Sequence, residues 1–159
     1  MTVHALTFAT ALGRMRLSWT VEGVCALRFV EGLDRDEARE APSWVHDAMR
    51  RLMAHIAGHP QDLTAIPVDL SELTPFQRRV AEVLQTTNPG QTISYGEVAL
   101  LAGRPGAARA VGQAVKANPI LILVPCHRVV AANGPGGWSA FGSPERKARL
   151  LELERITGG

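Results

Sequence analysis

The residues best suited to chemistry in this sequence are three neighbours, Cys126, His127 and Arg128. They follow an apolar run at 120–124 and Pro125, which indicates a buried strand with a thiol at its end. Burial disfavours a thiolate, whereas adjacent cationic or basic groups lower a cysteine pKa from about 8.5 into the reactive range. The triplet therefore predicts a nucleophilic thiol with a base beside it. The alternative is a small, inert core residue that precedes a histidine by chance.

A carboxylate is expected to complete this group from the last helix of the chain. Four residues spaced i, i+3, i+4 and i+7 share one face of that helix: Lys147, Leu150, Leu151 and Glu154. A carboxylate on an apolar face needs a partner. We expect Glu154 to orient His127 as the third member of a nucleophile, base and orienter arrangement. A salt bridge to an arginine is an equally open interpretation.

Two short helices are predicted on either side of a Gly-Arg-Pro-Gly turn at 103–106, and they have the outline of a helix-turn-helix. The second, at 107–117, carries few side chains that could read base edges in the major groove. A helix of small residues permits close backbone approach, which suits the minor groove. Arg109, its one long cationic side chain near the start, would then act as a probe. Alternatively the alanines pack against neighbouring helices, as Ala107, Val111 and Val115 are expected to do.

The remaining pattern predicts an α+β fold. A small N-terminal antiparallel-sheet lobe, 1–70, is expected to pack on a mostly helical C-terminal lobe, 71–159, that contains the helix-turn-helix. Alternating and apolar stretches predict strands, and capping signals at Ser43, Thr74, Ser94 and Ser143 predict helix starts. The expected strands are 3–8, 14–21 and 24–30, and the expected helices are 44–56, 75–85, 94–103, 107–117 and one beginning at 144. The connector at 57–69 should hold at most one short strand.

Composition narrows the class of protein. The chain has 159 residues, 46% of them hydrophobic, and a formal net charge of +2. Residues 1–70 carry 7 Arg and Lys against 9 Asp and Glu, whereas residues 71–159 carry 10 against 6. The excess of positive charge thus lies in the half of the chain that contains the cysteine motif. Such an excess favours contacts with phosphate groups.

Two cysteines, Cys25 and Cys126, are too few for a disulfide framework, and we expect both to be reduced. No secretory signal or membrane span is visible, so a cytoplasmic protein without a membrane partner is expected. His55 and His59 stand at i, i+4, but Gly58 and Pro60 interrupt the helix there. We expect no metal site and no cofactor.

Taken together, four motifs resemble those of the O6-alkylguanine-DNA alkyltransferases, also called methylated-DNA-protein-cysteine methyltransferases: Ser94-Tyr95-Gly96, Arg109-Ala110-Val111-Gly112, Asn118-Pro119 and Pro125-Cys126-His127-Arg128-Val129. The resemblance is close over 74–156. It implies direct DNA repair, in which an alkyl group moves from O6-alkylguanine in duplex DNA to the protein's own cysteine. O4-alkylthymine is a second lesion of the same chemistry. Because a thioether cannot be hydrolysed to the thiol, one turnover per molecule is expected, by a monomer bound in the minor groove.

The resemblance also implies residue roles. Cys126 is similar to the alkyl acceptor, His127 to the base that acts through a water, Glu154 to the carboxylate behind it, and Asn118 to a hinge between the helix-turn-helix and the active site. The substrate-binding residues would be Tyr95, Val129 and Ser139. The DNA-binding residues would be Arg109, which replaces the extruded nucleotide in the base stack, with Tyr95, Ala110, Gly112 and Gln113. The zinc ligand set that some relatives carry is missing here, and the loop before Lys147 is about two residues longer than usual.

Three other functions compete with alkyl transfer. Alkyltransferase-like proteins bind damaged DNA without reacting, but they have tryptophan at the position of Cys126. A thiol hydrolase using Cys126 and His127 would leave the helix-turn-helix without a use. A transcription regulator would need base-reading side chains that 107–117 does not offer.

Overall fold

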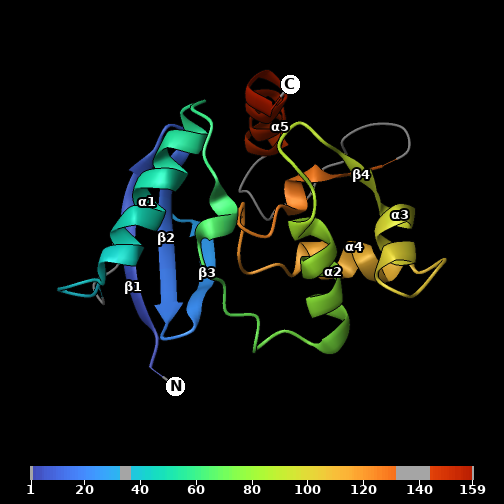
Figure 1. Ribbon diagram of the computed structural model, residues 1–159, viewed down its shortest axis with the longest axis horizontal. Coiled ribbons are helices and arrows are strands. Elements are labelled where there is room, and N and C mark those ends of the chain that lie inside the picture. Colours follow the sequence, from blue (N-terminus) through green and yellow to red (C-terminus); the bar gives the residue numbers. More distant parts are fainter. Residues whose placement is uncertain (1, 33–36, 132–143, 159) are drawn as a thin grey trace.

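The computed structural model describes residues 2–32, 37–131 and 144–158. Its N-terminal part is a three-stranded antiparallel sheet in the order β1-β2-β3, covered by one helix (Figure 1). The strands are β1 (His4–Thr10), β2 (Gly13–Thr20) and β3 (Gly23–Phe29). Leu6 pairs with Leu17 and Leu17 with Leu27, so one face of the sheet is apolar, as the alternating sequence predicted.

Helix α1 (Ser43–Ile56) covers the N-terminal sheet with its apolar stripe. Val45, Ala48 and Leu52 on this stripe are fully buried, whereas His46 on the opposite side is exposed. The connector then forms a short 3-10 helix, η1 (Leu63–Ala65), and a single bridge between Val68 and Val24. The expected helix and three strands are thus confirmed to within a few residues.

The C-terminal part is mostly helical. Both expected capping boxes form, at Thr74 before α2 and at Ser94 before α3, with side-chain and backbone partners as predicted. Helices α3 and α4 pack together across the turn at 102–107 and form the helix-turn-helix. The elements in order are α2 (Pro75–Gln85), β4 (Ile93–Ser94), α3 (Tyr95–Leu101), α4 (Ala108–Lys116), η2 (Cys126–Arg128), β5 (Val129–Val130) and α5 (Pro144–Gly158).

The apolar run at 120–124 is not a strand, and this expectation was wrong. Only Ile120 bridges to β3, and the chain then turns, with Val124 N donating to Ile120 O at 3.1 Å. Ile122 has φ 72°, a left-handed conformation that is rare for a β-branched residue. The run is buried on all sides, and a buried turn has the same apolar composition as a buried strand.

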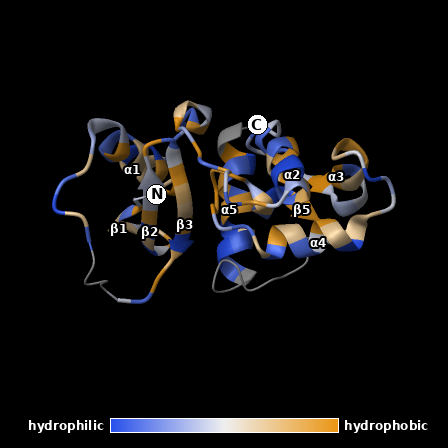
Figure 2. Cartoon of the chain, turned by 90° about the horizontal axis from the view of Figure 1, so that it is seen from below, coloured by the Kyte–Doolittle hydropathy of each residue, from blue (hydrophilic) through white to orange (hydrophobic). Residues whose placement is uncertain are grey.

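The two parts are joined along β3. Leu27 N donates to Pro119 O at 2.8 Å, and Leu121 N donates to Leu27 O at 2.9 Å. Figure 2 shows the sheet and α1 on one side, α2 to α4 on the other, and α5 between them. The turn that precedes Cys126 is therefore anchored to the N-terminal sheet. In the described residues no helix is long and apolar enough to cross a membrane.

Candidate active site

Cys126, His127 and Arg128 form the 3-10 helix η2, and all three side chains are buried. Asn118 fixes the turn that leads into η2 with both ends of its amide. Its Nδ2 donates to Ile120 O at 3.2 Å and to Val124 O at 3.0 Å, and its Oδ1 accepts from Ile120 N at 3.0 Å. Asn118 therefore connects the end of α4 to the segment that presents the thiol.

Glu154 lies behind η2 on the inward face of α5, with a side chain only 1% exposed. Its Oε1 meets His127 Nε2 at 2.8 Å and accepts from Arg128 Nε at 2.9 Å. Its Oε2 accepts from Arg128 Nη2 at 2.8 Å and meets His55 Nε2 at 2.9 Å. The carboxylate therefore contacts both partners that the sequence left open, the imidazole of His127 and the guanidinium of an arginine.

The electrostatics of this cluster fix the protonation of His127. Burial raises the pKa of Glu154, but the hydrogen bonds from Arg128, His127 and His55 outweigh it and hold the pKa far below its ordinary value. Glu154 is thus an acceptor, so His127 Nε2 carries a proton. Burial also lowers the pKa of His127, although Glu154 opposes this effect. The imidazole is therefore neutral, with Nδ1 able to take a proton.

The thiol of Cys126 does not have the low resting pKa that its neighbours suggested. Burial raises the pKa of Cys126 to about 11, and the Asn118 hydrogen bond and the charge of Lys147 only partly offset this effect. Lys147 is 1% exposed, and its Nζ donates to Val129 O at 3.0 Å. Burial lowers the pKa of this lysine to about 8. Sequence reasoning placed Lys147 on the inward face of its helix but gave it no function.

Tyr95 is brought to the same place by a pairing that the sequence did not reveal. Ile93 pairs with Val129 and Ser94 with Val130 in the parallel β4-β5 ladder, so the start of α3 lies beside the residue that follows η2. Burial raises the pKa of the half-buried Tyr95 phenol, and the nearby Cys126 raises it further. Val129 is buried, and its carbonyl accepts the bond from Lys147 Nζ. Ser139 lies outside the described residues.

Helix α4 turns two faces to different surroundings. Val111, Ala114 and Val115 are buried, while Arg109 and Gln113 are exposed and Ala110 and Gly112 are half-exposed. A Cβ atom on Gly112 would lie 3.9 Å from Tyr95 Cε1, so the exposed face continues toward the phenol. The packing stripe expected from the sequence is thus present at Val111 and Val115, and Arg109 lies on the exposed face.

Comparisons with known proteins identify the relatives of this arrangement. Residues 75–156, just over half of the chain, match the family model described as 6-O-methylguanine DNA methyltransferase, DNA binding domain. The methylated-DNA--protein-cysteine methyltransferase of Mycobacterium bovis is 40% identical over 158 residues, which cover 96% of this chain and 93% of the relative. The chain belongs to the methylated-DNA-protein-cysteine methyltransferase family.

Other members of this family extend the likeness. The methyltransferase of Methanosarcina acetivorans is 39% identical, with 92% of this chain and 95% of the relative covered. The crystal structure of the Mycobacterium tuberculosis O6-methylguanine methyltransferase superimposes with a TM-score of 0.80 at 38% identity, and covers 98% of this chain and 94% of that chain. The structure of that protein in complex with DNA gives 0.78 at 39% identity, covering 97% and 94%. The resemblance and the α+β fold expected from the sequence are confirmed.

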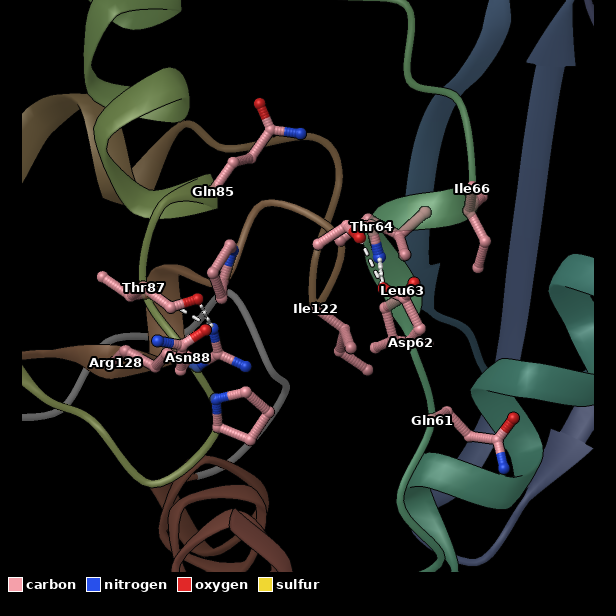
Figure 3. A pocket seen from close by; sticks show the side chains of 13 residues that line it. Gln61, Asp62, Leu63, Thr64, Ile66, Gln85, Thr87, Asn88, Ile122 and Arg128 are labelled. Atoms are coloured by element: carbon pink, nitrogen blue, oxygen red, sulfur yellow. Dashed lines mark hydrogen bonds between the residues drawn. The ribbon is translucent and has the colours of Figure 1, made fainter.

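The methyltransferase-type site has a cavity behind it, between the two parts of the molecule. This cavity has a volume of about 370 Å³ and is lined from one side by Thr87, Asn88 and Arg128 and from the other by Asp62 and Leu63 (Figure 3). Cys126 is not among its lining residues. The cavity is therefore separate from the thiol in this structure.

His55 is the member of the site that sequence reasoning missed. Only its i, i+4 spacing to His59 was considered, and it was set aside because Gly58 and Pro60 interrupt the helix, whereas the structure shows His55 5% exposed and bound to Glu154. In the part of the chain that the structure describes, no three His, Cys, Asp or Glu side chains are grouped to hold a metal ion. The signal that could have found His55 is its place on the apolar stripe of α1, seven residues after Ala48 and three after Leu52.

Proposed function

We propose that this protein repairs alkylated DNA directly, by moving an alkyl group from O6 of guanine in a duplex to Sγ of Cys126. O4-alkylthymine would react by the same chemistry. The observation that carries the proposal is the buried series Cys126, His127 and Glu154, in which the carboxylate holds His127 Nε2 at 2.8 Å. With that nitrogen occupied as a donor, Nδ1 serves as the base for the thiol proton, through a water.

The reaction balances with groups that the chain supplies. The proton of Cys126 passes to His127, a bond forms between Sγ and the alkyl carbon, and the carbon to O6 bond breaks. The electron pair stays on the guanine, and donation from the Tyr95 hydroxyl stabilises the charge that develops there. Because the thiol pKa is about 11, a base is needed at neutral pH. Lys147 and Asn118 assist by favouring the thiolate once it forms.

The product explains why each molecule acts once. A thioether has no carbonyl that water could attack, so neither His127 nor any neighbour can regenerate the thiol. Cys126 is also the residue that separates this proposal from a damage sensor, because a binder that never reacts needs no nucleophile at this position. The transfer is therefore stoichiometric.

On the DNA side we propose that α4 enters the minor groove with its exposed face. Ala110 and Gly112 permit close approach, Gln113 contacts the backbone, and Arg109 fills the stack where the nucleotide leaves. Extrusion is required because a thiol inside the protein cannot reach a methyl carbon inside a duplex. The extruded base would be held by Tyr95 and by the backbone of Val129, with Ser139 as a further contact.

Three broader assignments accompany this proposal. The boundary between the supporting and the reacting domain is placed between residues 70 and 71, where the connector from η1 reaches α2. The protein acts as a monomer, because every proposed reacting group belongs to one chain. It works in the cytoplasm, where thiols stay reduced.

Mass spectrometry of the reacted protein tests the proposal. The protein is incubated with a duplex that contains one O6-methylguanine and then digested. We expect one added methyl per molecule, on the peptide that contains Cys126, and no second turnover. Tight binding without transfer would favour the sensor function, and repeated turnover would exclude a thioether product.

A second measurement tests the role of Arg109. The Arg109→Ala variant should transfer from duplex DNA at least about tenfold more slowly, because the extruded state loses its replacement in the stack. Its reaction with the free base should stay unchanged. Arg155→Ala, which removes an exposed charge on α5, is the matched control. An equal loss with both substrates would remove Arg109 from base extrusion.

A further inference from the structure

Glu154 receives a hydrogen bond from the N-terminal lobe, of whose described residues His55 alone contacts the carboxylate. His55 stands near the end of α1, in the N-terminal part, and its Nε2 lies 2.9 Å from Glu154 Oε2. Both side chains are buried, at 5% and 1% exposure. The remaining partners of the carboxylate, His127 and Arg128, both come from η2. In Figure 1 helix α5 accordingly lies between the N-terminal sheet and the helices of the C-terminal part.

The four contacts are shared evenly between the two carboxylate oxygens. Oε1 holds His127 Nε2 and Arg128 Nε, and Oε2 holds Arg128 Nη2 and His55 Nε2. A carboxylate offers about four lone-pair positions, so His55 takes the last one. Without His55, Oε2 keeps one partner, so only the two-point Arg128 contact would hold the plane of the carboxylate, and the hold on His127 would loosen.

We propose that His55 is a positioning residue for alkyl transfer, so that the N-terminal lobe completes the catalytic group through Glu154. The proposal rests on the proposed function and adds a residue to it. His55 touches neither the thiol nor the substrate, and it acts only through the orientation of Glu154. The N-terminal lobe thereby contributes to the reaction itself.

The charges around His127 give this role a measurable signature. Glu154 from α5, Arg128 from η2 and His55 from α1 all act on the imidazole: Glu154 raises its pKa, while burial, Arg128 and His55 lower it. Removing His55 loosens the hydrogen bond from Glu154, which is the strongest influence that raises the pKa of His127, and this loss outweighs the weaker charge effect of His55, so the pKa of His127 falls. A base with a lower pKa stays unprotonated to a lower pH, so the acidic limb of the transfer rate shifts downward. A residue that only fills space would not move this limb.

Four variants separate positioning from packing. His55→Phe keeps a ring and removes the N–H donor. His55→Gln places an amide N–H near the position of Nε2, whereas His55→Asn is one carbon shorter and cannot reach Glu154. His46→Gln, at an exposed position of the same helix, is the matched control. Single-turnover transfer from the methylated duplex is measured against pH, and thermal unfolding gives the folded fraction.

We expect His55→Phe and His55→Asn to react on the order of tenfold more slowly with the acidic limb moved to lower pH, because a misplaced base loses alignment and the support of Glu154. His55→Gln should recover most of the rate, and His46→Gln should match the wild type. If His55→Phe does not fold, the comparison of the Gln and Asn variants decides. Equal rates for these two, or an unshifted limb in both, would overturn the proposal. An unreactive wild type in the same assay would instead overturn the proposed function.

Discussion

The two cysteines of this chain differ both in burial and in the charges around them. Burial is the largest cause of a raised pKa at both Cys25 and Cys126. Around Cys25 the next influence, Asp69, raises the pKa further, and so does Glu72. Around Cys126 the next influences, Asn118 and Lys147, lower it. A reactive thiol is therefore marked by the groups that stabilise its thiolate when a base removes the proton, and not by a low resting pKa.

Replacing each thiol in turn should give the largest difference in methyl transfer. Cys126→Ser should abolish methyl transfer, because a hydroxyl is a far weaker nucleophile at neutral pH than a thiol. Cys25→Ala should keep the wild-type rate, since its surroundings oppose a thiolate. The measurement is the methyl yield per molecule from a lesion-bearing duplex. Transfer that survives in Cys126→Ser, or that disappears in Cys25→Ala, would reverse the comparison.

The carboxylates beside the two thiols sharpen the contrast. Glu154→Gln leaves the buried Arg128 without its charged partner, so we expect a loss of about 3 kcal/mol in the free energy of unfolding and a transfer rate on the order of a hundredfold lower. Asp69→Asn, beside Cys25, should leave the transfer rate unchanged. Chemical denaturation and single-turnover kinetics on both variants measure these effects. A Glu154→Gln variant with wild-type kinetics would separate Glu154 from the reaction.

The same carboxylate gives the stability a pH dependence of known sign. The pKa of Glu154 is depressed in the folded protein, so its contribution is complete above the unfolded value of about 4.3 and is lost as pH falls below it. As the pH falls below about 5, the free energy of unfolding should therefore decrease more steeply in the wild type than in Glu154→Gln. Parallel slopes in denaturation midpoint against pH would contradict this expectation.

Replacing Lys147 should reduce the rate of methyl transfer less than replacing Glu154. Lys147→Met removes the charge that lowers the pKa of Cys126 and keeps a long side chain, so we expect transfer to slow about tenfold at neutral pH. Since the pKa of Lys147 is about 8, the wild-type rate should show an inflection near that pH that the variant lacks. Arg149→Met, at an exposed position of α5, is the control. The pH profile of single-turnover transfer checks both points.

The sequence predicted the helices well because their ends carry strong local signals. Thr74 and Ser94 form capping boxes whose partners lie three residues away, so both can be recognised without tertiary information. The inward position of Glu154 followed from helical spacing in the same way. The positions of Cys126, His127 and Glu154 could therefore be predicted from short-range pattern, whereas their roles and that of Asn118 came from the family resemblance.

What the sequence did not reveal depends on contacts between distant segments. The β4-β5 pair has two residues in each strand, too short for an alternating pattern, and it forms because η2 folds back beside Ser94. The turn at 120–124 was mistaken for a strand because burial, and not regular pairing, made it apolar. His55 meets Glu154 across 99 residues, which no local spacing reports.

The smallest expected difference concerns access to the two thiols in the absence of DNA. The side chain of Cys126 is 0% exposed, whereas Cys25 is partly exposed. An alkylating reagent such as iodoacetamide should therefore modify Cys25 before Cys126 in the folded protein, by about tenfold in rate, although the groups around Cys126 favour its thiolate more. Peptide mass spectrometry over a time course measures both rates, and unfolded protein provides the reference in which the rates converge. Faster labelling of Cys126 in the folded protein would mean that stabilisation of its thiolate outweighs burial even before DNA binds.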